Sequence, residues 1–116
     1  MTQAVAYATP RTSKVNALPG AIFEVKPDMK SVMSLGSRPL EFLALYETPG
    51  GALGKGSKAF PGNRLEVLVK PKRYQGINCI KVRNLESGRE GYIYWTDFYH
   101  STRPVANCNE QLSNTN

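Results

Sequence analysis

Basic and aromatic residues concentrate in the stretch from Asn63 to Tyr99, and these residue types can bind a polyanion. The candidate contact residues are Lys70, Lys72, Arg73, Tyr74, Lys81, Arg83, Arg89 and Tyr94. Lysine and arginine side chains neutralise phosphates, and an exposed aromatic ring can stack on an unpaired base. This combination predicts a surface that binds DNA or RNA.

The expected strands and turns of this stretch bring the candidate residues together. Lys72, Arg73 and Tyr74 lie in a predicted turn over residues 71–76, directly after Lys70, and period-two spacing points Lys81 and Arg83 the same way from the returning strand. Arg89 leads into the next strand, on which Tyr92 and Tyr94 share one face. We therefore expect the bases to converge on the central hairpin.

The overall charge agrees with an anionic partner. The chain has 15 Lys and Arg against 9 Asp and Glu, a formal net charge of +6, which favours association with nucleic acid or an acidic protein surface. A solvated basic face, with the tyrosines closing the ends of a barrel, also explains the same residues. Both interpretations stay open.

Residues suited to catalysis do not form a recognisable constellation. His100 is the only histidine, Cys79 is expected to face outward from its strand with no base beside it, and Asp97 is best explained as a helix cap. The carboxylates are scattered, without metal-ligand spacing. We therefore predict a non-enzymatic protein that uses no cofactor or metal.

A glycine-rich segment, GGALGKGSKAFPGN, superficially resembles a phosphate-binding loop. The pattern fails because Pro49 stands where the first glycine is needed and Gly56 follows Lys55 instead of serine or threonine. We interpret the segment as a surface loop, able to close over a ligand through Lys55 and Lys58.

Alternating and apolar runs predict a mainly β domain. Strands are expected over residues 21–26, 40–46 (buried on both sides), 64–70, 77–83 and 91–95. Asp28 followed by MKSVMSLG predicts a short helix, and a single helical turn is expected at Phe98–His100. In the strand 64–70 the side chains of Leu65, Val67 and Val69 should point inward.

The two ends of the chain lack periodicity. Residues 1–19 are predicted to be a flexible arm and residues 101–116 a flexible tail with one possible β-bridge near Val105, which leaves a domain over residues 20–100. No signal segment or membrane span is expected. With only Cys79 and Cys108, reduced thiols in a cytoplasm, or in a host cytoplasm if a virus encodes the chain, are the simplest expectation.

The succession LALYETPGG, GNRLEVL, INCIKVRN and SGREGYIYWTDFY resembles that of SH3-like barrels, particularly the bacterial type. The resemblance covers about residues 40–100 and implies a small barrel closed by a 3₁₀ turn. It leaves residues 20–39 unexplained. Ile77-Asn78 and Tyr94 replace the Trp and the Pro of the peptide-binding members, so the resemblance does not imply binding of proline-rich peptides.

Two functions follow as hypotheses. The first is a binding module that holds nucleic acid on the basic and aromatic face. The second is a protein-interaction module of a phage or plasmid, docking on a host enzyme or a virion component.

Overall fold

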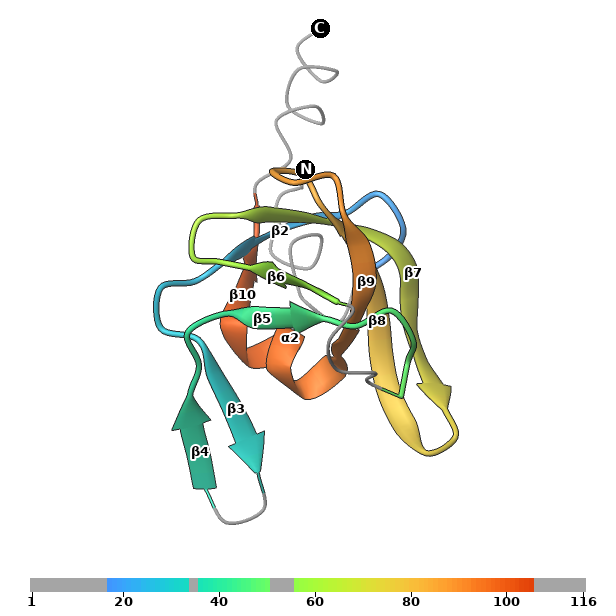
Figure 1. Ribbon diagram of the computed structural model, residues 1–116, viewed down its shortest axis with the longest axis horizontal. Helices are drawn as coiled ribbons and strands as arrows, with labels where there is room; N and C mark the ends of the chain where they lie inside the picture. The colour runs from blue at the N-terminus through green and yellow to red at the C-terminus, as the bar shows by residue number, and fades with distance from the viewer. Residues whose placement is uncertain (1–16, 34–35, 51–55, 106–116) are drawn as a thin grey trace, which may run out of the picture.

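A five-stranded antiparallel sheet forms the centre of the molecule, in the order β10-β2-β7-β8-β9. The computed structural model describes residues 17–33, 36–50 and 56–105 (Figure 1). The strands of the sheet are β2 (Ile22–Val25), β7 (Arg64–Tyr74), β8 (Ile77–Asn84), β9 (Glu90–Tyr94) and β10 (Thr102–Pro104). One short helix, α2 (Trp95–Ser101), follows β9. The prediction of a small, mainly β domain is confirmed.

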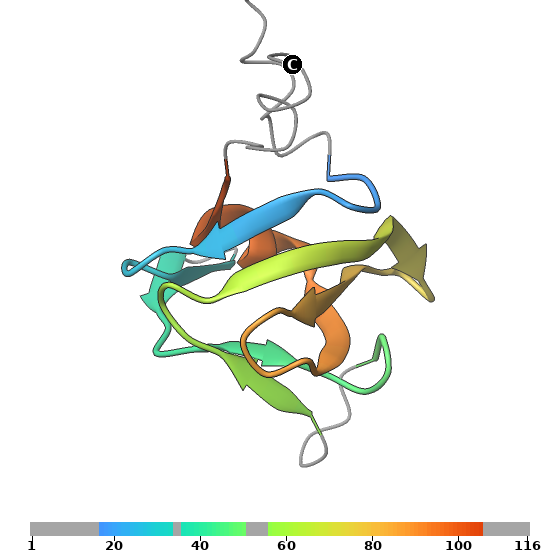
Figure 2. The same cartoon turned by 90° about the horizontal axis from the view of Figure 1, so that it is seen from above.

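Two further two-stranded ribbons lie within the described residues. β3 (Lys30–Met33) pairs with β4 (Gly36–Pro39), and β5 (Leu43–Leu45) pairs with β6 (Ser57–Ala59). Figure 2 shows β5 and β6 as a second layer facing β2 and β7. β5 is joined to the edge of the large sheet where Tyr46 and Tyr92 exchange two backbone hydrogen bonds, each 2.8 Å long.

The core fills the space between these layers. Leu65 and Val67 are buried on β7, as their alternation predicts, whereas Val69 is only half-buried beside a register irregularity. Phe98 of α2 is fully buried, and its ring meets that of Phe23 edge-on at 4.9 Å. Such edge-to-face contacts add to the hydrophobic burial of both rings. The helix therefore closes one end of the core.

Close backbone contact between β5 and β9 requires glycine at residue 91. A Cβ atom added there would lie 2.7 Å from the Leu45 Cβ and 2.9 Å from the Leu45 carbonyl carbon. Real side chains do not reach such distances, so any larger residue would push the two strands apart. The second layer can therefore pack against β9 only if residue 91 is glycine.

The predicted helix after Asp28 is wrong, because the chain forms the β3–β4 hairpin there. So short a helix gains little from its own hydrogen bonds. Ser101 instead supplies a side-chain partner to the strand: its Oγ accepts from the Lys30 N–H at 3.0 Å and donates to the Lys30 carbonyl at 3.1 Å. The positive φ of Gly36 fits the hairpin.

The predicted turn over residues 71–76 is also too long. β7 continues to Tyr74, and the turn consists of Gln75 and Gly76, whose φ angles are +51° and +87°. Two positive φ angles are typical of the tight turns that connect twisted strands. Pro71 fits within β7 because the pairing is irregular between Val69 and Lys72. The strand expected over 91–95 begins at Glu90 and ends before Trp95.

The ordered fold reaches further than the predicted domain. Ala17 is buried, and at the other end Ser101 and Thr102 are fully buried while β10 pairs with β2. The bridge expected near Val105 corresponds to a hydrogen bond from its N–H to the Ile22 carbonyl at 3.0 Å. The rest of the predicted arm and tail, with Cys108, lies outside the described residues.

We expect replacement of Phe98 by alanine to lower the free energy of unfolding by about 3–5 kcal/mol, because it leaves a cavity between α2 and the sheet. Urea denaturation measures this loss. The control is Leu85→Ala, since Leu85 is 45% exposed and should change stability little. Equal losses for the two variants would contradict the proposed role of Phe98.

Candidate nucleic-acid interface

Lys81 and Arg83 lie on the same face of β8, as expected, but both form ion pairs with acidic side chains. Arg83 donates to Glu90 at 2.8 Å and lies 3.5 Å from Glu66, and Lys81 lies 3.9 Å from the other oxygen of Glu90. The hydrogen bond from Arg83 holds the pKa of the Glu90 carboxyl below its ordinary value. Cross-strand register explains these pairs, because Arg83 stands opposite both Glu66 and Glu90.

Arg89 does not join the other candidate bases. It lies in the turn between β8 and β9, whereas Lys72 and Arg73 lie beside the turn between β7 and β8. These turns are at opposite ends of β8, as Figure 1 shows. The predicted set of bases is therefore divided between the two ends of the sheet.

Three candidate bases lie within four residues of one another on β7, next to the turn of the β7–β8 hairpin. Lys70, Lys72 and Arg73, here called the basic tip, are all exposed. Within the described part of the chain, none of the three forms an ion pair. Their charges therefore remain available to an external anion.

Four tyrosines extend from this tip across the sheet and are here called the tyrosine strip: Tyr74, Tyr92, Tyr94 and Tyr46. The rings of Tyr74 and Tyr92 are 5.6 Å apart, and those of Tyr46 and Tyr94 are 5.3 Å apart. All four are half-buried. Sequence reasoning selected Tyr74 and Tyr94 but not Tyr92 or Tyr46, although the position of Tyr92 opposite Lys81 follows from strand register.

Cations lie over two of these rings. The Nζ of Lys72 is 5.7 Å from the centre of the Tyr74 ring, and the Nζ of Lys81 is 5.5 Å from that of Tyr92. Partial burial raises the pKa of the Tyr74 hydroxyl, with smaller contributions from Tyr92 and Cys79. The strip thus presents neutral phenols next to positive charge.

Cys79 corrects the prediction of an outward-facing thiol. It lies on the same face as Tyr94, its partner in register, but it is 99% buried because the segment after Tyr46 covers it. Its Sγ donates to the Pro49 carbonyl at 3.2 Å, and burial raises the pKa of the thiol. A buried neutral thiol is a poor nucleophile, so Cys79 acts as part of the support for the strip.

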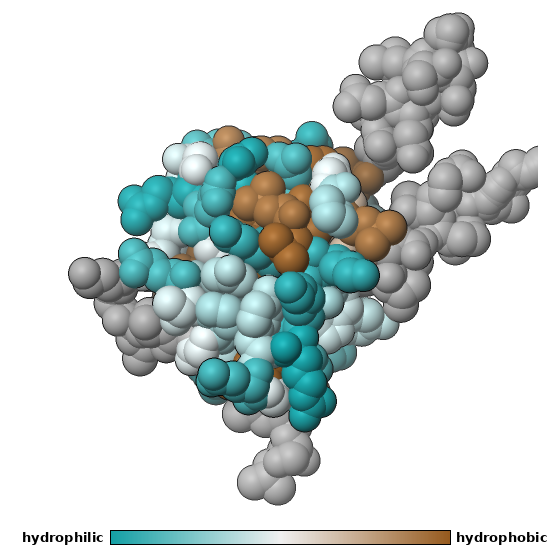
Figure 3. All heavy atoms as spheres, turned by 90° about the vertical axis from the view of Figure 1, so that its right-hand side faces the viewer, coloured by the Kyte–Doolittle hydropathy of each residue, from teal (hydrophilic) through white to brown (hydrophobic). Residues whose placement is uncertain are grey.

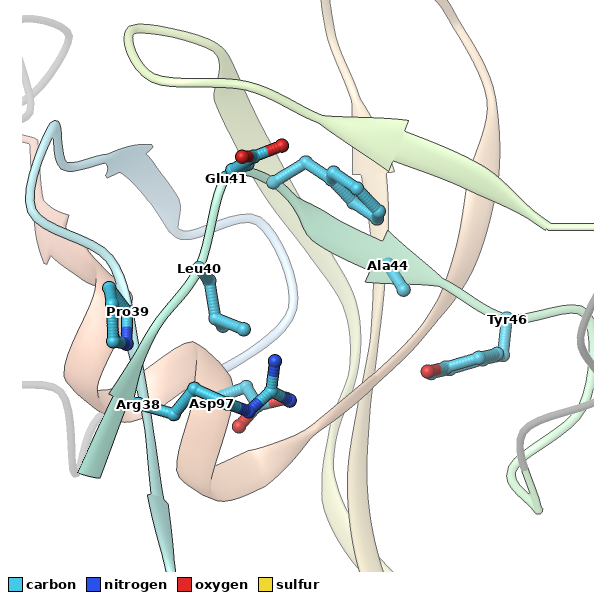
Figure 4. A pocket seen from close by; sticks show the side chains of 8 residues that line it. Arg38, Pro39, Leu40, Glu41, Ala44, Tyr46 and Asp97 are labelled. Atoms are coloured by element: carbon cyan, nitrogen blue, oxygen red, sulfur yellow. The ribbon is translucent and has the colours of Figure 1, made fainter. Parts of the chain in front are cut away.

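A pocket of about 380 Å³ opens at the other end of the tyrosine strip (Figure 4). Its lining residues are Arg38, Pro39, Leu40, Glu41, Phe42, Ala44, Tyr46 and Asp97. The expected strand over 40–46 is not buried on both sides: Leu43 and Leu45 enter the core, whereas Phe42, Ala44 and Tyr46 are only half-buried. This alternation supplies one wall of the pocket.

Lys58 extends the basic character beyond the pocket. The structure places it in β6 and not in a loop, with its Nζ 4.5 Å from the centre of the Phe42 ring. The ring of Phe60 also neighbours that of Phe42, with the two ring centres 6.2 Å apart. Lys55 lies outside the described residues.

Asp97 is not the helix cap that the sequence predicts. α2 begins after Tyr94 without any side-chain capping bond. Burial raises the pKa of the Asp97 carboxyl, against the opposing effects of a side-chain hydrogen bond with Ser31 and of the nearby Arg38 and His100. The carboxyl therefore connects α2 to β3 and faces the pocket.

No protein-family model, curated protein or solved structure matches this chain. The structure also shows, for the described residues, no cluster of three potential metal ligands and no helix long and apolar enough to cross a bilayer. The basic tip, the tyrosine strip and the pocket are therefore the features of the molecule that bear on its function.

We expect the free energy of unfolding of Asp97→Asn, relative to that of the wild type, to increase as pH rises. The folded pKa of Asp97 lies above its ordinary value, so its contribution to stability is complete at low pH and is lost as pH rises through the folded pKa. Asparagine does not ionise. Urea denaturation over a pH series measures the difference, and Asp28→Asn, at an exposed position, is the control. A difference that shrinks with rising pH would contradict this assignment.

Proposed function

We propose that this protein is a non-enzymatic module that binds single-stranded nucleic acid through the basic tip and the tyrosine strip. The observation that carries the proposal is the direct contact between the two: Lys72, which no carboxylate pairs among the described residues, lies over the Tyr74 ring. Cations beside aromatic rings suit a strand whose phosphates and bases are both exposed.

The tyrosine strip supports single strands over duplex. In a duplex the bases are stacked on one another, so tyrosine rings cannot reach their faces without unstacking them. An unpaired base can stack on a half-buried ring, which contributes about 1–3 kcal/mol per base. The spacing of the ring pairs, 5.3 and 5.6 Å, offers neighbouring contact points on one face.

The ion pairs of Lys81 and Arg83 limit the electrostatic part of the interface. Their charges already interact with Glu66 and Glu90, so phosphate contact there would require breaking these pairs. The basic tip alone supplies three phosphate contacts. Binding should therefore be of modest affinity and low sequence specificity in its phosphate contacts.

An SH3-like barrel is the fold that we propose for residues 40–100. The order of β5, β6, the β7–β8 hairpin, β9 and a short helix supports this proposal. β2, the β3–β4 hairpin and β10 would then be additions around the barrel. They contribute Arg38 and Pro39 to the pocket.

An exposed apolar patch favours a second candidate function, docking on another protein. Figure 3 shows apolar side chains gathered on one side of the molecule and bordered by hydrophilic ones. The turn that carries Leu18, which is 53% exposed, is held to β7 by a 2.9 Å hydrogen bond from the Gly20 N–H to the Val67 carbonyl. Such patches commonly mark protein contacts. A phage or plasmid protein that docks on a host factor would fit this surface.

We expect the logarithm of the affinity for a short single-stranded oligonucleotide to fall with the logarithm of salt concentration with a slope of about −2, because three phosphate contacts release counterions. Fluorescence anisotropy at a series of salt concentrations measures it. Replacing Lys70, Lys72 and Arg73 together by alanine should remove most of this slope. A slope of about −4 in the wild type would mean that Lys81, Arg83 and Arg89 also contact phosphates, which contradicts the proposed interface.

Two matched variants separate charge from stacking in the same experiment. Arg89→Ala removes one positive charge at the far end of β8 and should leave the slope unchanged. Tyr74→Leu should weaken binding without altering the slope, because stacking releases no counterions. Absence of salt-sensitive binding to any oligonucleotide would reject this function and leave the protein-docking candidate.

A further inference from the structure

We propose that the pocket beside the tyrosine strip binds one unpaired guanine base of the nucleic acid. This inference rests on the proposed function and adds a base preference to it. The pocket is continuous with the strip because Tyr46 belongs to both. A strand that stacks on the tyrosines can therefore place its next base in the pocket.

The charges of the lining select against an ionic occupant. Arg38 opposes a cationic side chain, whereas Asp97 and Glu41 oppose a phosphate or a carboxylate. A neutral ligand that offers both hydrogen-bond donors and acceptors satisfies the two signs together. Nucleobases have this chemistry, and their faces suit the Phe42 and Tyr46 rings in the same lining.

Arg38 and Asp97 are close enough to interact electrostatically, but no ion pair joins them in the described structure. In Figure 4 the side chains of both point into the pocket, and the Tyr46 hydroxyl points toward them from the opposite wall. Partial burial raises the pKa of this hydroxyl, so it remains an O–H donor. A ligand thus meets a guanidinium, a carboxyl and a phenol around one space.

Guanine matches the guanidinium and the carboxyl of the pocket better than the other bases do. Its O6 and N7 atoms accept from an arginine, and on its Watson–Crick edge two adjacent N–H groups can donate to one carboxylate. Adenine, cytosine and uracil do not offer two adjacent donors from ring and amino nitrogens. The volume of about 380 Å³ lies in the lower part of the range of small-ligand sites, about 300–1,000 Å³, which suits one base.

The test compares two single-stranded oligonucleotides of thymidines, one of which carries a single central guanosine. We expect the guanosine-containing strand to bind roughly tenfold more tightly, as one well-paired base contact allows. Replacing that guanosine by inosine removes the 2-amino group, one of the two adjacent donor groups, and should abolish most of the preference. Asp97→Asn should reduce the preference while binding to the all-thymidine strand persists, and Asp28→Asn should leave both unchanged.

The outcomes distinguish this inference from the function on which it rests. Equal binding of both strands, or a preference that survives Asp97→Asn, overturns the guanine pocket while the binding module stands. Failure of the wild type to bind either strand overturns both. Circular dichroism of Asp97→Asn checks that the variant is folded, and Arg38→Gln, on an exposed strand, provides an independent loss of the preference.

Discussion

The structure depends on the close approach of β5 to β9 at Gly91. Only the absence of a side chain there lets Leu45 pack against the β9 backbone, and this approach lets Tyr46 and Tyr92 exchange two hydrogen bonds of 2.8 Å. The contact closes the second layer over the core. It also places Tyr46 beside Tyr94 and so joins the tyrosine strip to the pocket. Fold and candidate site thus share one constraint.

Fewer bases are available to an external anion than the net charge of +6 indicates. Glutamates on neighbouring strands neutralise the middle of the β8 face, and the basic tip keeps its charge because β7 and β8 extend beyond these acids. Of the candidate bases on β7 and β8, the three at the end of the hairpin are therefore the ones without an acidic partner among the described residues. An anionic strand would meet the tip first and the tyrosines next.

Much of the fold could be predicted from local sequence. The alternation of Leu65 and Val67 predicts β7, and the mainly β class follows from such runs. The β3–β4 hairpin could not be predicted, because its strand character depends on Ser101, far away in the chain, which bonds the Lys30 backbone. Asp97 was misassigned for a similar reason: its partner Ser31 lies on that hairpin.

The site was predicted in part. The basic tip and Tyr74 can be predicted from residue types at one turn. The ion pairs of Lys81 and Arg83 can be predicted only from the register of three strands. Binding of a single strand along the basic tip and the tyrosine strip can be tested by mapping backbone amide chemical shifts by NMR while a single-stranded oligonucleotide is added. We expect the largest changes at Lys72, Tyr74, Tyr92 and Tyr46, with the turn around Arg89 unaffected. Changes centred on β2 and β10 instead, or on the Arg89 turn, would contradict it.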